Sequence, residues 1–123
     1  THAIWLEAPG GPENLTWRGI DVPPPGPGEA TVRQTYVGLN FIDVYHRTGL
    51  YPLAAYPAIL GMEAAGVVEA VGPGVADLQV GDRVAYIHGA GGAYAEKRNQ
   101  VAHRLVQLPD AITDEQGAAM MLK

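Results

Sequence analysis

The sequence predicts a mainly β domain, a barrel or sandwich of short strands joined by tight turns. Sixteen glycines and ten prolines occur among 123 residues, and they separate short β-prone runs instead of forming one low-complexity block. A hydrophobic content of 47% with 17% charged residues is typical of a globular chain with a buried core. We find no internal repeat and no linker, so residues 1–123 are expected to form one domain.

The expected strands are short segments with alternating or β-branched and aromatic residues. They are residues 2–7, 15–20, 30–39, 64–71, 83–87, 93–98 and 103–108. The prolines of 23–29 fix the backbone and lack a donor, so this segment is expected to be an extended connection rather than a central strand. Turns are expected at 9–12, 71–75 and 80–84, and a glycine-rich loop at 88–92.

A first short helix is predicted at 40–49, after the long strand. Asn40 is a good N-cap, Asp43 suits the positive end of a helix, and Gly49 suits its C-terminal stop. The segment 50–57 that follows is expected to be a loop.

A second helix is predicted to begin at Thr113. The hydroxyl of Thr113 and the side chain of Gln116 have the spacing of a capping box. Residues 117–122 are apolar or small on nearly every side, and such a helix needs protein around it. We therefore expect the chain to be the front part of a larger protein, and we expect the piece alone to be prone to association.

Composition narrows the classes of function. A net charge of −5 argues against general nucleic-acid binding. The absence of cysteine excludes disulfides and thiolate metal sites. No signal peptide and no long apolar stretch is visible, so the expectation is a cytoplasmic protein that does not bind a membrane.

Four segments, in this order, resemble the N-terminal GroES-like catalytic domain of the medium-chain dehydrogenase/reductase superfamily, which includes the alcohol dehydrogenases. They are G-L-N-F-I-D at 38–43, L-G-M-E-A-A-G-V-V at 60–68, V-G-P-G-V at 71–75 with V-G-D-R-V at 80–84, and G-A-Y-A-E at 92–96. The run N-F-I-D-V-Y-H-R-T-G-L-Y at 40–51 and G-G-P-E at 10–13 resemble the quinone oxidoreductase, or zeta-crystallin-like, branch. The resemblance implies a GroES-like partly open β-barrel with short helices, which ends before a Rossmann domain.

The same resemblance implies a reductase without zinc. Zinc alcohol dehydrogenases have Cys at the position of Asn40 and His at the position of Met62. An amide and a thioether are poor ligands for Zn²⁺, and the one remaining carboxylate, Glu63, does not hold zinc alone. Met62 is expected to fill the cleft or the core, and Glu63 to be structural.

The implied reaction is hydride transfer from NADPH to a quinone or another electron-poor acceptor such as an enone, in a homodimeric parent protein. The dinucleotide would be bound mostly by the downstream Rossmann domain, because residues 1–123 contain no strand–GxGxxG–helix unit, and the glycines of 88–92 lack that context. This chain alone is therefore expected to be inactive.

Four residues are the candidates for the site. Asn40 and Tyr45 would orient acceptor and nicotinamide, whereas Phe41 and Ile42 would mainly pack, with backbone contact to the nicotinamide. From the residues alone, Asn40 is better explained as an N-cap, and it is the resemblance that favours a role in the site, although both roles can coexist. Tyr45 is explained equally well as a side chain packed beside Phe41 at i and i+4. Both interpretations stay open at this point.

Two further functions remain as alternatives. One is a zinc-free enoyl reductase of the same superfamily, which would differ in its acceptor. The other is a non-catalytic module similar to chaperonin-10, because the barrel is shared and a fold does not fix a function.

Overall fold

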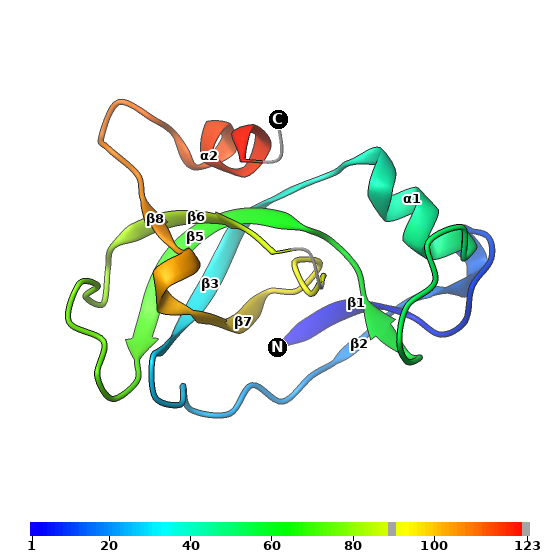
Figure 1. Cartoon of the computed structure of the whole chain (residues 1–123), viewed down its shortest axis with the longest axis horizontal. Helices are drawn as coiled ribbons and strands as arrows, with labels where there is room; N and C mark the ends of the chain where they lie inside the picture. The colour runs from blue at the N-terminus through cyan, green and yellow to red at the C-terminus, as the bar shows by residue number, and fades with distance from the viewer. Residues whose placement is uncertain (89–90, 122–123) are drawn as a thin grey trace.

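The computed structural model describes residues 1–88 and 91–121, and its strands form two antiparallel sheets (Figure 1). The smaller sheet has the strand order β2–β1–β4 and the larger one β7–β3–β5–β6–β8. The strands are His2–Leu6 (β1), Leu15–Gly19 (β2), Glu29–Gly38 (β3), Ala58–Ile59 (β4), Glu63–Val71 (β5), Arg83–Ile87 (β6), Lys97–Val101 (β7) and Val106–Gln107 (β8). The helices are Phe41–Thr48 (α1) and Asp114–Met120 (α2), with 3₁₀ turns at Pro12–Asn14 and Ala102–Arg104. The predicted mainly β fold is confirmed, and within the described ranges the sheets do not close into a barrel.

The larger sheet has a core on each face. The cluster on one face consists of Ala30, Val32, Ala64, Val68, Leu78, Val84, Tyr86, Ala93 and Leu105. On the other face, Ala65, Ala85 and Leu108 pack against Ala118 of α2. Because successive side chains of a strand point to opposite faces, neighbours such as Ala64 and Ala65 serve different cores. Figure 1 shows α2 on one side of this sheet, with β1 and β2 on the other.

Tyr94 and Ala95 join the two sheets. The backbone N–H of Ile4 in β1 donates to the Tyr94 carbonyl oxygen at 2.8 Å, and Ala3 forms an isolated bridge with Ala95. This connection fixes the small sheet, and the loop that follows α1 reaches it through β4, which pairs with β1 at Trp5 and Ile59. Contacts that fix the position of Tyr94 therefore also affect how the two sheets are held together.

Most elements lie where the sequence predicts them, and the caps are the best-placed features. Asn40 is the N-cap of α1, and Gly49 ends it with φ of 89°, in the left-handed region that glycine favours. Thr113 accepts a hydrogen bond from the Gln116 backbone N–H at 3.2 Å, which confirms the capping box of α2. Gly117 and Ala118 of α2 are buried against the sheet, while Met120 is 40% exposed.

The predicted strand at 93–98 is only partly correct, because continuous strand pairing begins at Lys97 and Ala95 forms only an isolated bridge. The side-chain amide of Gln34 donates to the carbonyl oxygens of Ala93 and Ala95, at 2.9 and 2.7 Å. A side chain of β3 thus satisfies acceptors that a strand ladder would use, and sequence patterning does not reveal such a contact.

The predicted strand at 103–108 is also mostly wrong, and β4 was not predicted. Leu105 donates its N–H to the Ala102 carbonyl oxygen at 3.0 Å, which closes a 3₁₀ turn before β8.

Two residues of the predicted loop at 88–92 lie outside the described residues. No helix in the described ranges is both long and apolar enough to cross a membrane.

Gly66 allows β3 and β5 to approach closely, and we predict that Gly66→Ala is destabilising. A Cβ at position 66 would lie 2.3 Å from the carbonyl oxygen of Arg33, so the two strands would have to separate. We expect the free energy of unfolding to fall by roughly 1–3 kcal/mol, measured by urea unfolding. At Gly19 the nearest atom is 3.8 Å from such a Cβ, so Gly19→Ala is a control expected to change stability by less than about 0.5 kcal/mol. Equal effects at the two positions would contradict this view of the sheet.

Tyr86 gives the fold a predicted weakness at high pH. Burial raises the pKa of the Tyr86 hydroxyl, and the nearby Arg98 guanidinium offsets this only in part. Between pH 10 and the folded-state pKa the unfolded chain loses this proton and the folded chain keeps it. Stability should therefore be full below about pH 10 and fall above it, by up to about 1.4 kcal/mol per pH unit. Urea unfolding at pH 8 to 11 measures this slope. The slope should be smaller in Tyr86→Phe, and an unchanged slope in that variant would refute the assignment.

Candidate functional site

Asn40 lies at the junction between β3 and α1, where its backbone is fixed by Asp43. The Asn40 N–H donates to Oδ2 of Asp43 at 3.1 Å, and the Asp43 N–H donates to the Asn40 carbonyl oxygen at 3.0 Å. A carboxylate in the first turn also suits the positive end of the helix. The position of Asn40 is thereby set by the start of α1 itself.

The side chain of Asn40 is directed toward Glu63. Its amide nitrogen donates to Oε2 of Glu63 at 2.6 Å. Glu63 is only 1% exposed, and its Oε1 accepts the backbone N–H of Met121, at the end of α2, at 3.1 Å. A hydrogen bond to a charged acceptor is among the stronger kinds, so this contact holds Asn40 in one orientation.

Gly38 provides the space for Glu63. The two residues are paired across β3 and β5, and a Cβ at position 38 would lie 2.3 Å from Cγ of Glu63 and 2.4 Å from the Ala118 carbonyl oxygen. These contacts agree with the expectation that Glu63 is structural. Its bond to Asn40 was missed, because two residues 23 positions apart show no common pattern in sequence.

The Glu63 bond leaves two hydrogen-bonding groups on the side chain of Asn40. Nδ2 carries two N–H groups and one of them donates to Glu63, so the second N–H can donate and Oδ1 can accept. Asn40 can therefore pair with a ligand group that accepts a hydrogen bond or with one that donates it.

Tyr94 is a second residue that sequence reasoning did not select. Its hydroxyl donates to Oδ2 of Asp43 at 2.5 Å, and Asp43 is only 3% exposed. Burial, the hydrogen bond to Asp43 and the charge of that carboxylate together raise the pKa of Tyr94 above its ordinary value. The G-A-Y-A-E motif was the available signal, although it gave no role for the tyrosine.

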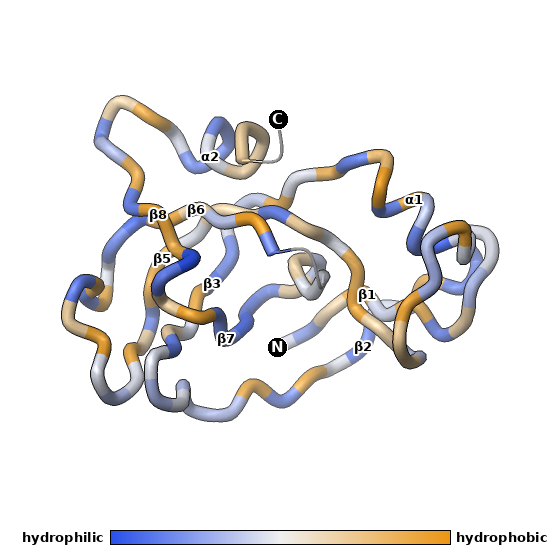
Figure 2. The backbone as a smooth tube through the Cα atoms, viewed as in Figure 1, coloured by the Kyte–Doolittle hydropathy of each residue, from blue (hydrophilic) through white to orange (hydrophobic). Residues whose placement is uncertain are grey.

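One face of α1 and the residues beside it form an exposed apolar surface. Leu39 and Phe41 are 81% and 79% exposed, and Figure 2 shows hydrophobic residues where the chain enters α1. The Tyr45 ring lies 6.5 Å from Phe41 and meets Tyr51 edge-on, with centroids 5.3 Å apart. Phe41, which is expected mainly to pack, contacts the Tyr45 ring and is otherwise exposed in this chain, and Tyr45 lies beside it as the i, i+4 spacing predicts.

Met62 is 8% exposed, which agrees with its expected role as a filler. In the described part of the chain no three His, Cys, Asp or Glu side chains gather in a way that could hold a metal ion.

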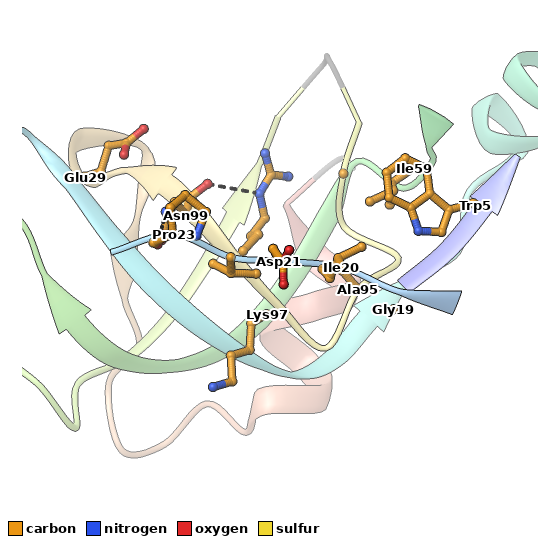
Figure 3. Close-up of a pocket in the computed structure, with 13 residues that line it drawn as sticks. Trp5, Gly19, Ile20, Asp21, Pro23, Glu29, Ile59, Ala95, Lys97 and Asn99 are labelled. Carbon is orange, nitrogen blue, oxygen red and sulfur yellow. Dashed lines mark hydrogen bonds between the residues drawn. The ribbon is translucent and has the colours of Figure 1, made fainter. Parts of the chain in front are cut away.

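A cavity of about 610 Å³ lies away from Asn40, next to β7 and the proline-rich connection. Figure 3 shows Trp5 and Ile59 toward one end of it and Pro23 and Asn99 toward the other. Arg98 lines it too, and its guanidinium donates to the Gly91 carbonyl oxygen at 2.8 Å. None of the four predicted site residues contributes to this cavity, so it is separate from the candidate site.

Comparison with known proteins identifies the family. Residues 26–110 match the model of the alcohol dehydrogenase GroES-like domain. A quinone oxidoreductase of Pseudomonas aeruginosa is 52% identical over 120 residues, which are 98% of this chain and 37% of that protein. A 2-haloacrylate reductase of a Burkholderia species is 44% identical, over 98% of this chain and 38% of that protein.

Solved structures agree with this result. The structure of Escherichia coli quinone oxidoreductase complexed with NADPH superposes with a TM-score of 0.95 at 43% identity, covering 99% of this chain and 37% of that one. The chain thus spans little more than a third of the length of the relatives that it matches. The family match, the relatives and the fold agree, and the chain belongs to the alcohol dehydrogenase GroES-like domain family.

Proposed function

We propose that this chain is the N-terminal catalytic domain of an NADPH-dependent reductase that transfers hydride to a quinone or a related electron-poor acceptor. The observation that carries the proposal is Asn40, held by Glu63 in one orientation beside the exposed aromatic face of α1. Similarity to quinone oxidoreductases over nearly the whole chain, one of them solved with NADPH, supports the same activity.

The residues present suit the nicotinamide end of the cofactor. NADPH would supply the hydride, which is chemistry that no side chain offers. Oδ1 of Asn40 would accept an N–H of the carboxamide, while Phe41, Ile42 and Tyr45 would give apolar contact. Tyr45 would also help to orient the acceptor. We propose that a Rossmann domain beyond residue 123 binds the pyrophosphate, because the described residues offer no glycine-rich turn that opens a helix.

We further propose that the reductase works without zinc. The amide nitrogen of Asn40 is directed at Glu63, and Met62 is a buried thioether. Neither group is a ligand that Zn²⁺ favours, so the donor set at these positions does not suit a catalytic zinc. Homodimer formation and a cytoplasmic location remain predictions from the sequence.

An electron-poor alkene is the second candidate acceptor. The 2-haloacrylate reductase is similar over 98% of this chain, and it shares the domain with the quinone oxidoreductases. Reduction of a C=C bond next to a carbonyl would be compatible with the same face of α1. The chaperonin-10-like alternative has no comparable support, because it gives no role to Asn40 or to the exposed aromatic side chains.

The full-length protein that contains this chain should oxidise NADPH when given 1,4-benzoquinone, followed by loss of absorbance at 340 nm. The same assay with 2-chloroacrylate and with an enone identifies the better acceptor.

Incubation with a chelator should leave the rate unchanged, whereas loss of activity restored by Zn²⁺ would contradict the zinc-free proposal. This chain alone should show no turnover and no micromolar binding of NADPH. A full-length protein that reduces none of the three acceptors would overturn the proposed function.

The bond between Asn40 and Glu63 can be tested by exchanging donor and acceptor. Asn40→Asp places a second carboxylate against Glu63, so we expect the free energy of unfolding to fall by roughly 1–3 kcal/mol. In the full-length enzyme kcat/KM should also fall, by about two- to tenfold. Adding Glu63→Gln supplies an amide that can donate to the new carboxylate, and it should recover much of the lost stability. Urea unfolding of the single and double variants gives the coupling energy.

The control for this exchange uses Glu69, which is a partly exposed carboxylate of β5 that pairs with Lys97 at 2.9 Å. Glu69→Gln should not restore stability to Asn40→Asp. Simple additivity of Asn40→Asp with Glu63→Gln would show that the two side chains do not act on one another.

A further inference from the structure

We propose that Tyr94 is a positioning residue for Asn40 and that it acts through Asp43. The proposal rests on the proposed function, because it concerns the residue that would meet the nicotinamide. Tyr94 belongs to the segment that joins the two sheets, whereas Asn40 and Asp43 belong to the start of α1. The hydroxyl of Tyr94 thus connects the frame of the domain to the helix that bears the site.

Asp43 depends on these two partners. Its Oδ2 accepts from the Tyr94 hydroxyl at 2.5 Å and from the Asn40 backbone N–H at 3.1 Å. Its Oδ1 is buried and has no hydrogen-bond partner among the described residues. A buried carboxylate needs donors, so the same oxygen that holds Asn40 relies on Tyr94. Without the hydroxyl, Asp43 would gain by turning toward solvent and releasing the Asn40 N–H.

Tyr94 is itself held on three sides. Its N–H donates to the Leu60 carbonyl oxygen at 2.9 Å, and its carbonyl oxygen accepts from Ile4. Its ring lies against Gly61, where a Cβ would be 2.5 Å from Cδ1 of the tyrosine, and Gly61 has φ of 98°. The bonded backbone and the close approach of the ring to Gly61 fix where the hydroxyl lies, and Asp43 and Asn40 are held relative to it.

The hydroxyl is a donor throughout the working range of an enzyme. Burial and the neighbouring Asp43 carboxylate raise the pKa of Tyr94, so the proton stays on the oxygen at neutral and mildly alkaline pH. The connection from Tyr94 to Asn40 is therefore a permanent one and does not act as a pH switch.

The first test follows amide hydrogen exchange by NMR in the full-length protein, comparing Tyr94→Phe with Thr31→Val. Both changes remove one hydroxyl that donates to another side chain, but Thr31 donates to Asn99 between β3 and β7 and not to any residue of α1 or of 93–95. In Tyr94→Phe we expect exchange of the Asn40 and Asp43 amides to speed up at least about tenfold more than exchange in β5. In Thr31→Val these amides should change only as much as the rest of the sheet. A uniform change in Tyr94→Phe, or none at Asn40, would overturn the proposal.

The second test measures kinetics in the full-length enzyme. Tyr94→Phe should lower kcat about two- to tenfold with a smaller change in KM for NADPH, because a misplaced Asn40 affects the reacting geometry more than overall binding. In an Asp43→Ala background the further change Tyr94→Phe should have no additional effect on kcat. Independent, multiplying effects of the two changes would overturn the route through Asp43. A wild-type protein without reductase activity would instead refute the proposed function, and the exchange experiment would still test the geometry.

Discussion

The buried carboxylate of Glu63 is the contact on which the arrangement of the site depends. One oxygen accepts from the side chain of Asn40 at the start of α1, and the other accepts from the backbone of Met121 at the end of α2. Glu63 itself is the first residue of a central strand, and it has room there only because residue 38 on the neighbouring strand is glycine. A carboxylate at 1% exposure has high desolvation costs, which these donors offset. The same donors connect both helices to the sheet.

Two carboxylates hold the same asparagine from different sides. Glu63 accepts from its side chain and Asp43 from its backbone, and Asp43 in turn is bound by Tyr94. The residue before α1 is thereby determined by groups from β5, from α1 and from the segment that joins the sheets. Sites need this kind of support, because a side chain on a strand–helix junction would otherwise adopt several rotamers.

The elements that the sequence predicts correctly are those with local signals. Asn40, Asp43 and Gly49 mark the ends of α1 within ten residues of one another, and Thr113 with Gln116 marks the start of α2 in the same way. Errors occur where a distant partner decides the structure. The Gln34 side chain donates to the carbonyl oxygens of Ala93 and Ala95, where the sequence predicts a strand, and no property of 93–98 alone reveals this contact.

The residues of the candidate site likewise differ in whether local sequence or a distant contact reveals them. Asn40 and Tyr45 were selected because both lie in the run at 40–51 that resembles the quinone oxidoreductases, and such a run is a local feature. Glu63 received only a structural role and Tyr94 none, since their importance arises from contacts across 23 and 51 positions. Phe41 was expected mainly to pack, yet it is 79% exposed and its ring contacts that of Tyr45. An exposed aromatic face next to a firmly held amide is compatible with binding a flat ring.

The orientation of Asn40 is compatible with both of the contacts proposed for it. One N–H of its amide is bonded to Glu63, which leaves the second N–H as a donor and Oδ1 as an acceptor. Oδ1 would suit the N–H groups of a carboxamide, whereas the second N–H would suit the carbonyl oxygen of a quinone or an enone. Tyr45 and Tyr51 add two hydroxyl groups beside the exposed face of α1, and their rings meet edge-on with centroids 5.3 Å apart. Groups that would stabilise charge on the reduced acceptor are therefore present on this chain in the amide of Asn40 and in these two tyrosines, before any contribution from solvent or from the rest of the full-length protein.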